Sequence, residues 1–443
     1  MKARKYIFFL IFWTGSVGWL AAQEKAIELN SVEAVWQFGF AQNPDLASYQ
    51  LQQQKAANDL KAAKGAHLPQ ISFSGSGQWN ADLATTLLPP ELGFLTGEPG
   101  QATEAQFGTE FNYNAGLNVN QSLFDWQIIQ QKRIRHAAMK TSDAQTEAFE
   151  QSLKQQLALN YYTALIAEEA LAVNERDLQV ADSILQLSQE KFEHGLIDLY
   201  SHNQAKINVN NLQQNAASSR RLFEQSRYQL KLLLGAESDQ LLVLSGQLDP
   251  AQLTTSPELV MDKNLLVLEQ QLLQYGEQVS LAKGAFAPKL SASAYLGKQQ
   301  FRDDFGLSFS EGAWSNYNFV SLNLSVPIFS GFSNKVQLSN AKLDQEQARL
   351  QLKSETSRAR SRDMLLQEEY AGSLITARAA LENFKLSEQN SQLSHQKFMK
   401  GLISLDSRLR SFDDYLKSEN AYLNALSALY GDYATIISRI QTP

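Results

Sequence analysis

Apolar side chains recur along the chain with two different periods, and each period predicts a different kind of element. The longer period is seven residues, the spacing of a coiled-coil seam. This seam consists of Leu157, Ala164, Leu171, Leu178, Leu185 and Phe192. Beside it runs a row of small or polar residues, namely Asn160, Ala167, Asn174, Ala181 and Ser188. One apolar row next to one small row suits a helix that is wedged between neighbouring helices in a wall.

The positions of proline and glycine predict how long these helices are. No proline lies in residues 100–249 or 328–442, so both tracts permit very long helices. Gly195 and Gly401 interrupt the tracts where helix-to-helix turns are expected. The predicted helix 126–193 has 68 residues, roughly 100 Å at about 1.5 Å per residue. A compact domain does not need a helix of this length.

The shorter period is two residues, and it predicts four strands, at about 70–80, 109–124, 289–298 and 317–328. One face of each strand is apolar. The other face is uncharged and polar, and we expect it to line a wet lumen with Ser72, Ser74, Ser76, Asn112, Asn114, Asn118, Asn120, Ser291, Ser293, Ser321, Asn323 and Ser325. Such strands are typical of a transmembrane β-barrel. A soluble antiparallel sheet has the same alternation, but it usually mixes charged residues into its wet face.

Four strands are too few to close a membrane barrel, since the smallest closed barrels use about eight. An open sheet edge in lipid would leave backbone N–H and C=O groups without hydrogen-bond partners. We therefore expect the chain to oligomerise in order to complete the barrel.

The first 22 residues predict a secretory signal peptide. Lys2, Arg4 and Lys5 form its basic part, an apolar stretch follows, and Ala22 offers a cleavage site. An uncleaved N-terminal anchor is the alternative, but the apolar stretch is short and glycine interrupts it twice. The mature chain is therefore predicted to be exported.

Composition narrows the class of protein further. The absence of cysteine excludes disulfides, thiolate metal sites and an N-terminal lipid-bearing cysteine. The net charge of −7 argues against a nucleic-acid partner. The mean hydropathy of −0.31 argues against a membrane protein built from several apolar helices.

The second half of the chain repeats the first. Residues 191–201, KFEHGLIDLYS, match residues 397–407, KFMKGLISLDS. Residues 63–69 are likewise echoed by residues 282–288, each time just before a predicted strand. The predicted organisation is a signal peptide (1–22), a first repeat (23–235), a linker (236–258) and a second repeat (259–443).

Each repeat is predicted to contain a helix, two strands, a long helix, a tight tip and a returning helix. In the first repeat the last three are the long helix 126–193, the tip 194–200 and the helix 201–235. In the second repeat they are the long helix 332–399, the tip 400–406 and the helix 407–440.

Three features together give the chain a family resemblance: the duplication, the strand-to-helix corners 123–126 (LFDW) and 328–331 (IFSG), and the paired FxxGLI turns. With them the mature chain resembles the TolC-like outer-membrane efflux proteins, or outer membrane factors. The resemblance implies a mainly α fold with a membrane β part. In that fold a long α-helical barrel is continued by a trimeric 12-stranded transmembrane β-barrel, with four strands from each protomer.

The resemblance also implies location, partners and function. It implies a homotrimer in the outer membrane of a Gram-negative cell, in contact with outer-membrane lipid and with a long periplasmic extension. The family serves as the passive exit duct of tripartite efflux or type I secretion systems. Its partners are a periplasmic adaptor, or membrane fusion, protein and an inner-membrane pump of the RND or ABC type.

Two groups of site residues follow from the resemblance. The hairpin tips that meet the adaptor map onto Gly195, Leu196, Ile197, Gly401, Leu402 and Ile403. The alternative for Leu and Ile is that they only staple each turn to its own helices. The family's acidic ring at the periplasmic mouth falls on Ser407 and Arg410 here, so it does not transfer. We expect instead a gate in which Arg410 pairs with Asp406, Asp413, Asp414 or a neighbouring helix; a solvated helix face is the alternative.

The sequence offers no catalytic, cofactor or metal-binding motif, and its five histidines are scattered. We therefore do not expect an enzyme. A structural or adhesive coiled-coil protein of the cell envelope is the alternative, but it has no need of amphipathic strands in both halves. The cargo is left open among drugs, metal cations and polypeptides.

Overall fold

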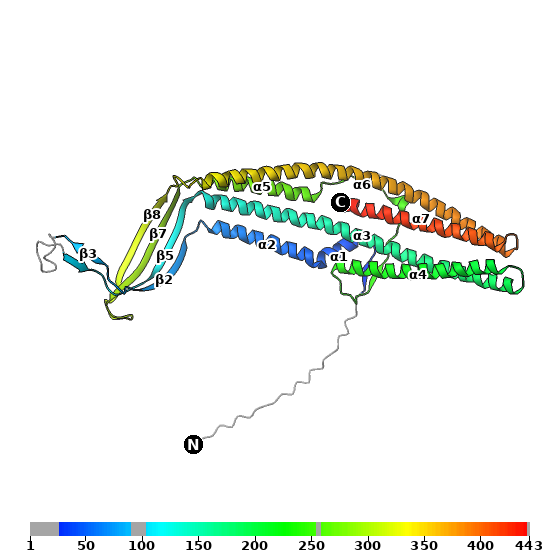
Figure 1. Cartoon of the computed structure of the whole chain (residues 1–443), viewed down its shortest axis with the longest axis horizontal. Helices are drawn as coiled ribbons and strands as arrows, with labels where there is room; N and C mark the ends of the chain where they lie inside the picture. Colours follow the sequence, from blue (N-terminus) through cyan, green and yellow to red (C-terminus); the bar gives the residue numbers. More distant parts are fainter. Residues whose placement is uncertain (1–25, 90–102, 254–257, 441–443) are drawn as a thin grey trace, which may run out of the picture. The chain divides into compact units, whose positions relative to one another are not determined.

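A computed structural model describes residues 26–89, 103–253 and 258–440 (Figure 1). The predicted signal peptide and its cleavage site lie outside these residues. The chain forms two compact units. We call one the sheet unit (44–89, 103–154, 258–371 and 436–440) and the other the helical unit (26–43, 155–253 and 372–435). Each unit takes segments from both sequence repeats.

The sheet unit is built on one four-stranded antiparallel sheet with the order β2-β5-β7-β8. Its strands are β2 (Gln70–Trp79), β5 (Phe111–Asp125), β7 (Lys289–Arg302) and β8 (Ser315–Ser325). They are the four strands that the alternation predicts. β7 runs four residues further than expected, because its end pairs with Phe111 of β5. β8 ends at Ser325 instead of residue 328, two residues before Pro327, which has no N–H to donate.

A small hairpin was not predicted. It consists of β3 (Thr85–Leu88) and β4 (Thr103–Gln106), which pair antiparallel and lie between β2 and β5 in the sequence.

The helices of the sheet unit are α2 (Pro44–Gly65), α5 (Lys263–Gly284) and the first parts of α3 (Trp126–Glu193) and α6 (Ser333–Met399). The bounds of α3 are those predicted. Where α5 meets the start of α3, the Trp126 indole N–H donates to the Ser280 carbonyl at 3.3 Å. A Cβ on Gly284 would lie only 2.1 Å from Trp126 Cδ1, so this approach requires glycine.

The helical unit contains α1 (Val32–Gln42), α4 (Leu199–Leu234), most of α7 (Leu405–Ile437) and the remaining parts of α3 and α6. Two short strands, β1 (Ile27–Leu29) and β6 (Leu242–Leu244), pair in parallel and were not predicted. The helix expected at the start of the first repeat is two helices, α1 and α2. They separate at Asn43, because the ring of Pro44 disfavours a helical residue before it.

The predicted seam of α3 lies against the core of the helical unit. Leu157 and Ala164 are fully buried there. The row of small residues faces α4, since Asn174 Nδ2 donates to Ser219 Oγ at 3.0 Å and Ser188 Oγ lies 3.1 Å from His202 Nδ1. α3 is therefore packed along two faces, as its two rows predict. Within the described ranges, no helix combines the length and the apolar character needed to span a membrane.

Candidate functional sites

The two tip turns have the same backbone geometry. Gly195 and Gly401 have φ of +69° and +72°. In the first turn Gly195 N–H donates to Phe192 O at 2.9 Å and Leu196 N–H to Lys191 O at 2.8 Å. The second turn has the equivalent pair of bonds at 3.0 and 2.9 Å. This is a Schellman motif, and its left-handed residue explains why both tips carry glycine.

The apolar residues that follow each glycine behave differently from one another. Leu196 is 71% exposed and Leu402 is 70% exposed. Ile197 and Ile403 instead pack against a buried cluster that includes Val209, and they hold the turns to their own helices. Stapling thus accounts for the isoleucines, and the leucines are the apolar side chains presented to solvent.

A hydrogen-bonded cap begins the helix after each tip. Asp198 Oδ1 accepts from Ser201 N–H at 2.9 Å, and this bond lowers the pKa of Asp198. Ser404 Oγ accepts from Ser407 N–H at 3.2 Å in the same way. Both returning helices therefore start three residues after the turn leucine, two residues earlier than predicted.

The predicted gate residues lie on α7, but their charges are arranged differently from the expectation. Arg410 Nε donates to the backbone carbonyl of Asp406 at 3.4 Å, and Arg410 forms no ion pair with Asp406, Asp413 or Asp414 within the described part of the chain. Asp413 instead pairs with Lys417 at 2.6 Å, which raises the pKa of that lysine. Arg410, Asp413 and Asp414 are exposed.

The Asp406 carboxylate accepts a hydrogen bond from Ser201 Oγ of α4 at 3.2 Å. The two tips of one chain are therefore joined by a polar contact that the sequence did not reveal.

A buried carboxyl pair joins α3 to α7, and it was not predicted. Asp177 is 3% exposed and Glu419 is 4% exposed, and their side chains are hydrogen-bonded to each other. The Tyr415 hydroxyl donates to Glu419 Oε1 at 2.9 Å. Burial is the first cause that raises both carboxyl pKa values, and the pKa of Glu419 rises to about 9. The pair therefore holds a proton at neutral pH.

The strand register brings the twelve predicted lumen residues onto one face of the sheet. Ser72 lies opposite Asn118, Ser293 opposite Asn120, and the remaining positions follow by alternation. Asn118 Nδ2 donates to Ser74 Oγ at 2.6 Å, and the hydroxyls of Ser293 and Ser321 are also 2.6 Å apart. Short polar side chains are thus linked across two of the three strand pairs, β2–β5 and β7–β8.

Two features of this face differ from a plain polar surface. An aromatic cluster of Tyr295, Tyr317 and Phe319 lies on it, with ring centroids 5.6–5.9 Å apart. A charged pair, Lys289 and Asp125, lies near one end, with Nζ and Oδ2 3.6 Å apart. The expectation that this face carries only uncharged polar residues is therefore wrong at Phe319, Lys289 and Asp125.

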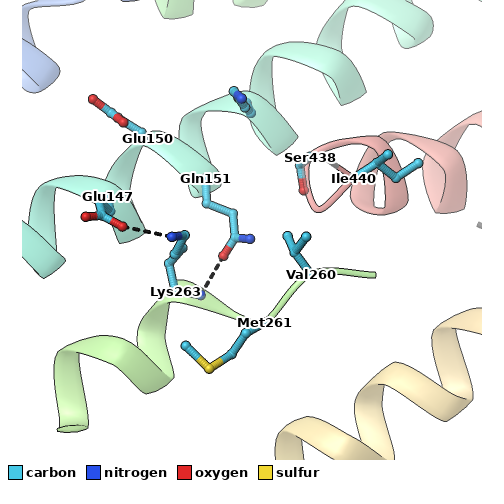
Figure 2. A pocket seen from close by; sticks show the side chains of 9 residues that line it. Glu147, Glu150, Gln151, Val260, Met261, Lys263, Ser438 and Ile440 are labelled. Atoms are coloured by element: carbon cyan, nitrogen blue, oxygen red, sulfur yellow. Dashed lines mark hydrogen bonds and ion pairs between the residues drawn. The ribbon is translucent and has the colours of Figure 1, made fainter. Parts of the chain in front are cut away.

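Figure 2 shows a pocket of about 540 Å³ in the sheet unit, where α3, the start of α5 and the end of the chain meet. Lys263 donates twice in it, from Nζ to Glu147 and from the backbone N–H to Gln151, both at 2.8 Å. Burial, followed by the neighbouring Glu147, raises the pKa of Glu150. No group of three or more histidine, aspartate or glutamate side chains in the described ranges is placed to hold a metal ion.

The chain is similar to known proteins in both sequence and structure. Residues 40–236 match the family model described as outer membrane efflux protein. The outer membrane protein TolC of Vibrio cholerae serotype O1 is 22% identical over 334 residues, which cover 72% of this chain and 69% of TolC. The Campylobacter jejuni CmeC outer membrane channel aligns with 99% of this chain and 93% of its own, with a TM-score of 0.73 and 17% identity. VceC, an outer membrane protein of Vibrio cholerae, aligns with 92% of this chain and 95% of its own, with a TM-score of 0.72 and 15% identity.

The long helices and the antiparallel sheet define an outer-membrane channel fold, which is mainly α with a membrane β part, as predicted. The matches show that the chain is similar to outer membrane efflux proteins, TolC among them, in agreement with the resemblance found in the sequence. The predicted location in the outer membrane agrees with these matches, which are all outer-membrane proteins. The relatives named here are outer-membrane proteins and channels, and none is described as an enzyme.

Proposed function

We propose that the chain forms a homotrimeric, passive exit duct across the outer membrane and periplasm. It would serve a tripartite efflux or type I secretion system and be coupled to a periplasmic adaptor and to an inner-membrane RND or ABC type pump. The observation that carries this proposal is the pair of identical tip turns, each of which presents one exposed leucine to solvent. An exposed apolar side chain repeated at two matching turns favours a protein partner.

The edges of the sheet support closure by further copies of the chain. β2 and β8 are the edge strands, and every residue of both strands is exposed. Because each strand runs antiparallel to its neighbour, β8 and β2 run in opposite directions. The β8 edge of one copy can therefore pair antiparallel with the β2 edge of the next copy, which leaves no free edge in lipid. Three copies would contribute 12 strands.

The polar face of the sheet supports a wet channel. Rows of serine and asparagine hydroxyls and amides allow water to fill a lumen without holding a solute strongly. The energy for transport would then come from the partner pump, and the pump would also select the cargo.

The contact between the tips supports a gate at the periplasmic mouth. The bond from Ser201 Oγ to the Asp406 carboxylate joins the two hairpins of one chain. Arg410 lies nine residues after Gly401 and is exposed, and we propose that it pairs with a carboxylate of a neighbouring copy. Opening would require both contacts to break.

Site-specific photocrosslinking tests the tips. A photoreactive residue at position 196 or 402 should trap the adaptor in intact cells. The matched control is position 393 on α6, where a leucine is also exposed at 53%. Trapping at the control position as efficiently as at the tips, or no adaptor at either tip, would rule out the tip contact. Heat-resistant trimers from outer membrane that conduct ions in a planar bilayer would support the duct, whereas a soluble rod would support the structural alternative.

Single-channel conductance tests the gate. Arg410→Ala and Ser201→Ala should each raise the open probability, because each removes a contact that holds the mouth shut. Arg349→Ala is the control, since Arg349 is an exposed arginine of α6 that pairs with Glu346. If Arg410→Ala and Arg349→Ala have the same open probability, Arg410 is not part of a gate.

A further inference from the structure

The loop between β7 and β8, residues 303–314, presents apolar side chains at the end of the sheet away from the long helices. Phe305 is 85% exposed, Phe309 is 84% exposed and Leu307 is 51% exposed. A single exposed apolar side chain needs no explanation, but three within residues 305–309 indicate a surface that meets apolar surroundings.

This loop is folded back onto the sheet and does not extend freely beyond it. Gln300 of β7 is 2% exposed, and its Nε2 donates to Ser308 O at 2.9 Å and to Ala313 O at 3.3 Å. Ser308 N–H donates in return to Gln300 Oε1 at 3.0 Å, and Gly306 N–H donates to the Tyr113 hydroxyl of β5 at 3.1 Å. The loop is therefore fixed by side chains of the sheet, and the exposure of its apolar residues is a property of the fold.

The side chains that hold the loop belong to the apolar face of the sheet. Gln300 pairs in register with Tyr113, and Tyr113 shares its face with Leu117 because the two positions are an even number of residues apart. The Phe305 ring also packs edge-on against Phe111 of this face, with the ring centroids 5.7 Å apart. The loop accordingly lies on the side opposite the serine and asparagine rows, outside the lumen of the proposed barrel.

A lysine on the same face indicates where the apolar part of the sheet ends. Along β7 this face is apolar up to Leu296, and the next residue on it is Lys298, which is exposed. No ion pair involves Lys298 within the ranges that the structure describes. A lysine at the edge of an apolar band keeps its hydrocarbon stem in the lipid and its ammonium group among the head groups. Gln300 and the loop follow directly, so the loop lies next to this boundary.

The charges of the loop itself are compatible with this location. Arg302 forms an ion pair with Asp304, so these two charges compensate each other. Asp303 and Glu311 are exposed and lie on either side of the apolar residues 305–309 in the sequence. The apolar stretch can therefore enter lipid while the carboxylates stay in water.

The place of the loop on the sheet favours lipid over a second copy of the chain as its partner. The loop is held by β5 and β7, which are the central strands. A neighbouring copy that completes the sheet would pair with the edge strands β2 and β8. The outward side of the two central strands is left to the surrounding membrane.

We propose that residues 303–314 form a membrane anchor whose Phe305 and Phe309 side chains insert between lipid molecules at the head-group boundary of the outer leaflet. The anchor rests on the proposed barrel, because the barrel brings this face of the sheet into lipid. It adds a contact that fixes the depth of the barrel in the membrane.

Fluorescence quenching tests the anchor on the full-length protein in phosphatidylcholine vesicles. The chain has no cysteine, so one introduced cysteine carries one nitrobenzoxadiazole label. Phe309→Cys reports on the loop, Val320→Cys on the apolar face of β8, and Glu311→Cys on water. A nitroxide near the head of the lipid acyl chain should quench the labels at 309 and 320. Iodide in the water should quench the label at 311 at least about tenfold more than the label at 309.

Variants that keep the label at position 309 test the two parts of the anchor. Phe305→Ser changes an exposed side chain and should lower the ratio of inserted to exposed loop about tenfold or more. Gln300→Ala removes the bonds to Ser308, so the label should become accessible to iodide. Gln299→Ala changes the neighbouring residue of β7, which points to the opposite face, and should leave the quenching unchanged.

The outcomes separate the anchor from the barrel. If lipid nitroxide quenches the label at 320 while iodide quenches the label at 309, the barrel stands and the anchor is wrong. If lipid nitroxide quenches neither label, the barrel and the anchor fail together. A label at 309 that is shielded from both quenchers would show a contact with protein and would overturn lipid as the partner. Unchanged quenching in Phe305→Ser would also contradict the anchor.

Discussion

Replacing Glu419 by glutamine should make the helical unit less sensitive to alkaline pH. Burial raises the pKa of Glu419 from 4.5 to about 9, and the carboxyl is hydrogen-bonded to Asp177. Between these two pH values the folded chain keeps a proton that an unfolded chain has lost. The stabilisation is therefore fully present below about pH 4.5 and is lost as the pH rises towards 9.

The size of the effect follows from this window. Because the folded chain retains one proton that the unfolded chain has lost, the free energy of unfolding falls by about 1.4 kcal/mol for each unit by which the pH rises. It therefore falls by about 3 kcal/mol from pH 6 to pH 8. Glu419→Gln has no proton to lose. Its amide can donate to Asp177 and its oxygen can still accept from Tyr415. With an unfolding entropy of about 2.1 cal/mol/K per residue over 443 residues, 3 kcal/mol corresponds to about 3 °C in Tm.

Thermal melts followed by circular dichroism at 222 nm provide the measurement. From pH 6 to pH 8 the Tm of the unmodified protein should fall by about 3 °C more than that of Glu419→Gln. Glu369→Gln, which removes an exposed carboxylate of α6, is the control and should follow the unmodified protein. Equal pH dependence of the unmodified protein and Glu419→Gln would mean that Glu419 is ionised in the fold, and the reasoning would fail.

Three further predictions concern the backbone and one buried ion pair. Gly401→Ala should lower the free energy of unfolding by about 1 kcal/mol, because φ is +72° at this position. Gly372 lies inside α6 with open space around it, so Gly372→Ala should raise the free energy of unfolding by about 0.5–1 kcal/mol. The urea midpoints of the two variants provide the comparison. Gly116→Ala should cost about 1–3 kcal/mol, seen as a lower yield of heat-resistant protein, because its Cβ would lie 2.7 Å from the backbone of β7. Arg439→Met removes the guanidinium that bonds Asp363 and a backbone carbonyl, and the same urea assay should show a loss of about 2 kcal/mol.

The spacing of apolar residues was sufficient to predict most of the helices and strands. The seven-residue seam and the absence of proline predict one long helix, and α3 has the predicted bounds. The period is easy to detect in this helix because its length lets the same packing contact recur many times. The period of two predicts all four strands of the sheet. The hairpin of β3 and β4 was missed because strands of four residues are too short to show a period.

The glycines of the two tips predicted the turns. The buried charged residues of α7, Arg408 and Glu419, were not predicted. A signal for them exists in α7, where Leu405, Arg408, Phe412, Tyr415 and Glu419 follow one another at alternating steps of three and four residues. That stripe faces the core, so its arginine and glutamate occupy positions that normally hold apolar residues. Which groups they would meet on α3 and α6 depends on how the helices are aligned, and the sequence does not contain this alignment.

The two repeats carry different basic residues at one equivalent position, and the difference decides which repeat buries a charge. The seventh residue after the tip glycine is His202 in the first repeat and Arg408 in the second, and each reaches a serine of the preceding helix, at 3.1 Å in both cases. His202 lies against Ser188 and stacks on the Phe192 ring. A guanidinium cannot be neutral, so only the second repeat leaves a buried charge to be matched. Arg408→His should therefore keep the link to Ser391 and remove the cost of burying a charge, so its urea midpoint should be higher than that of Arg408→Ala, which loses the link.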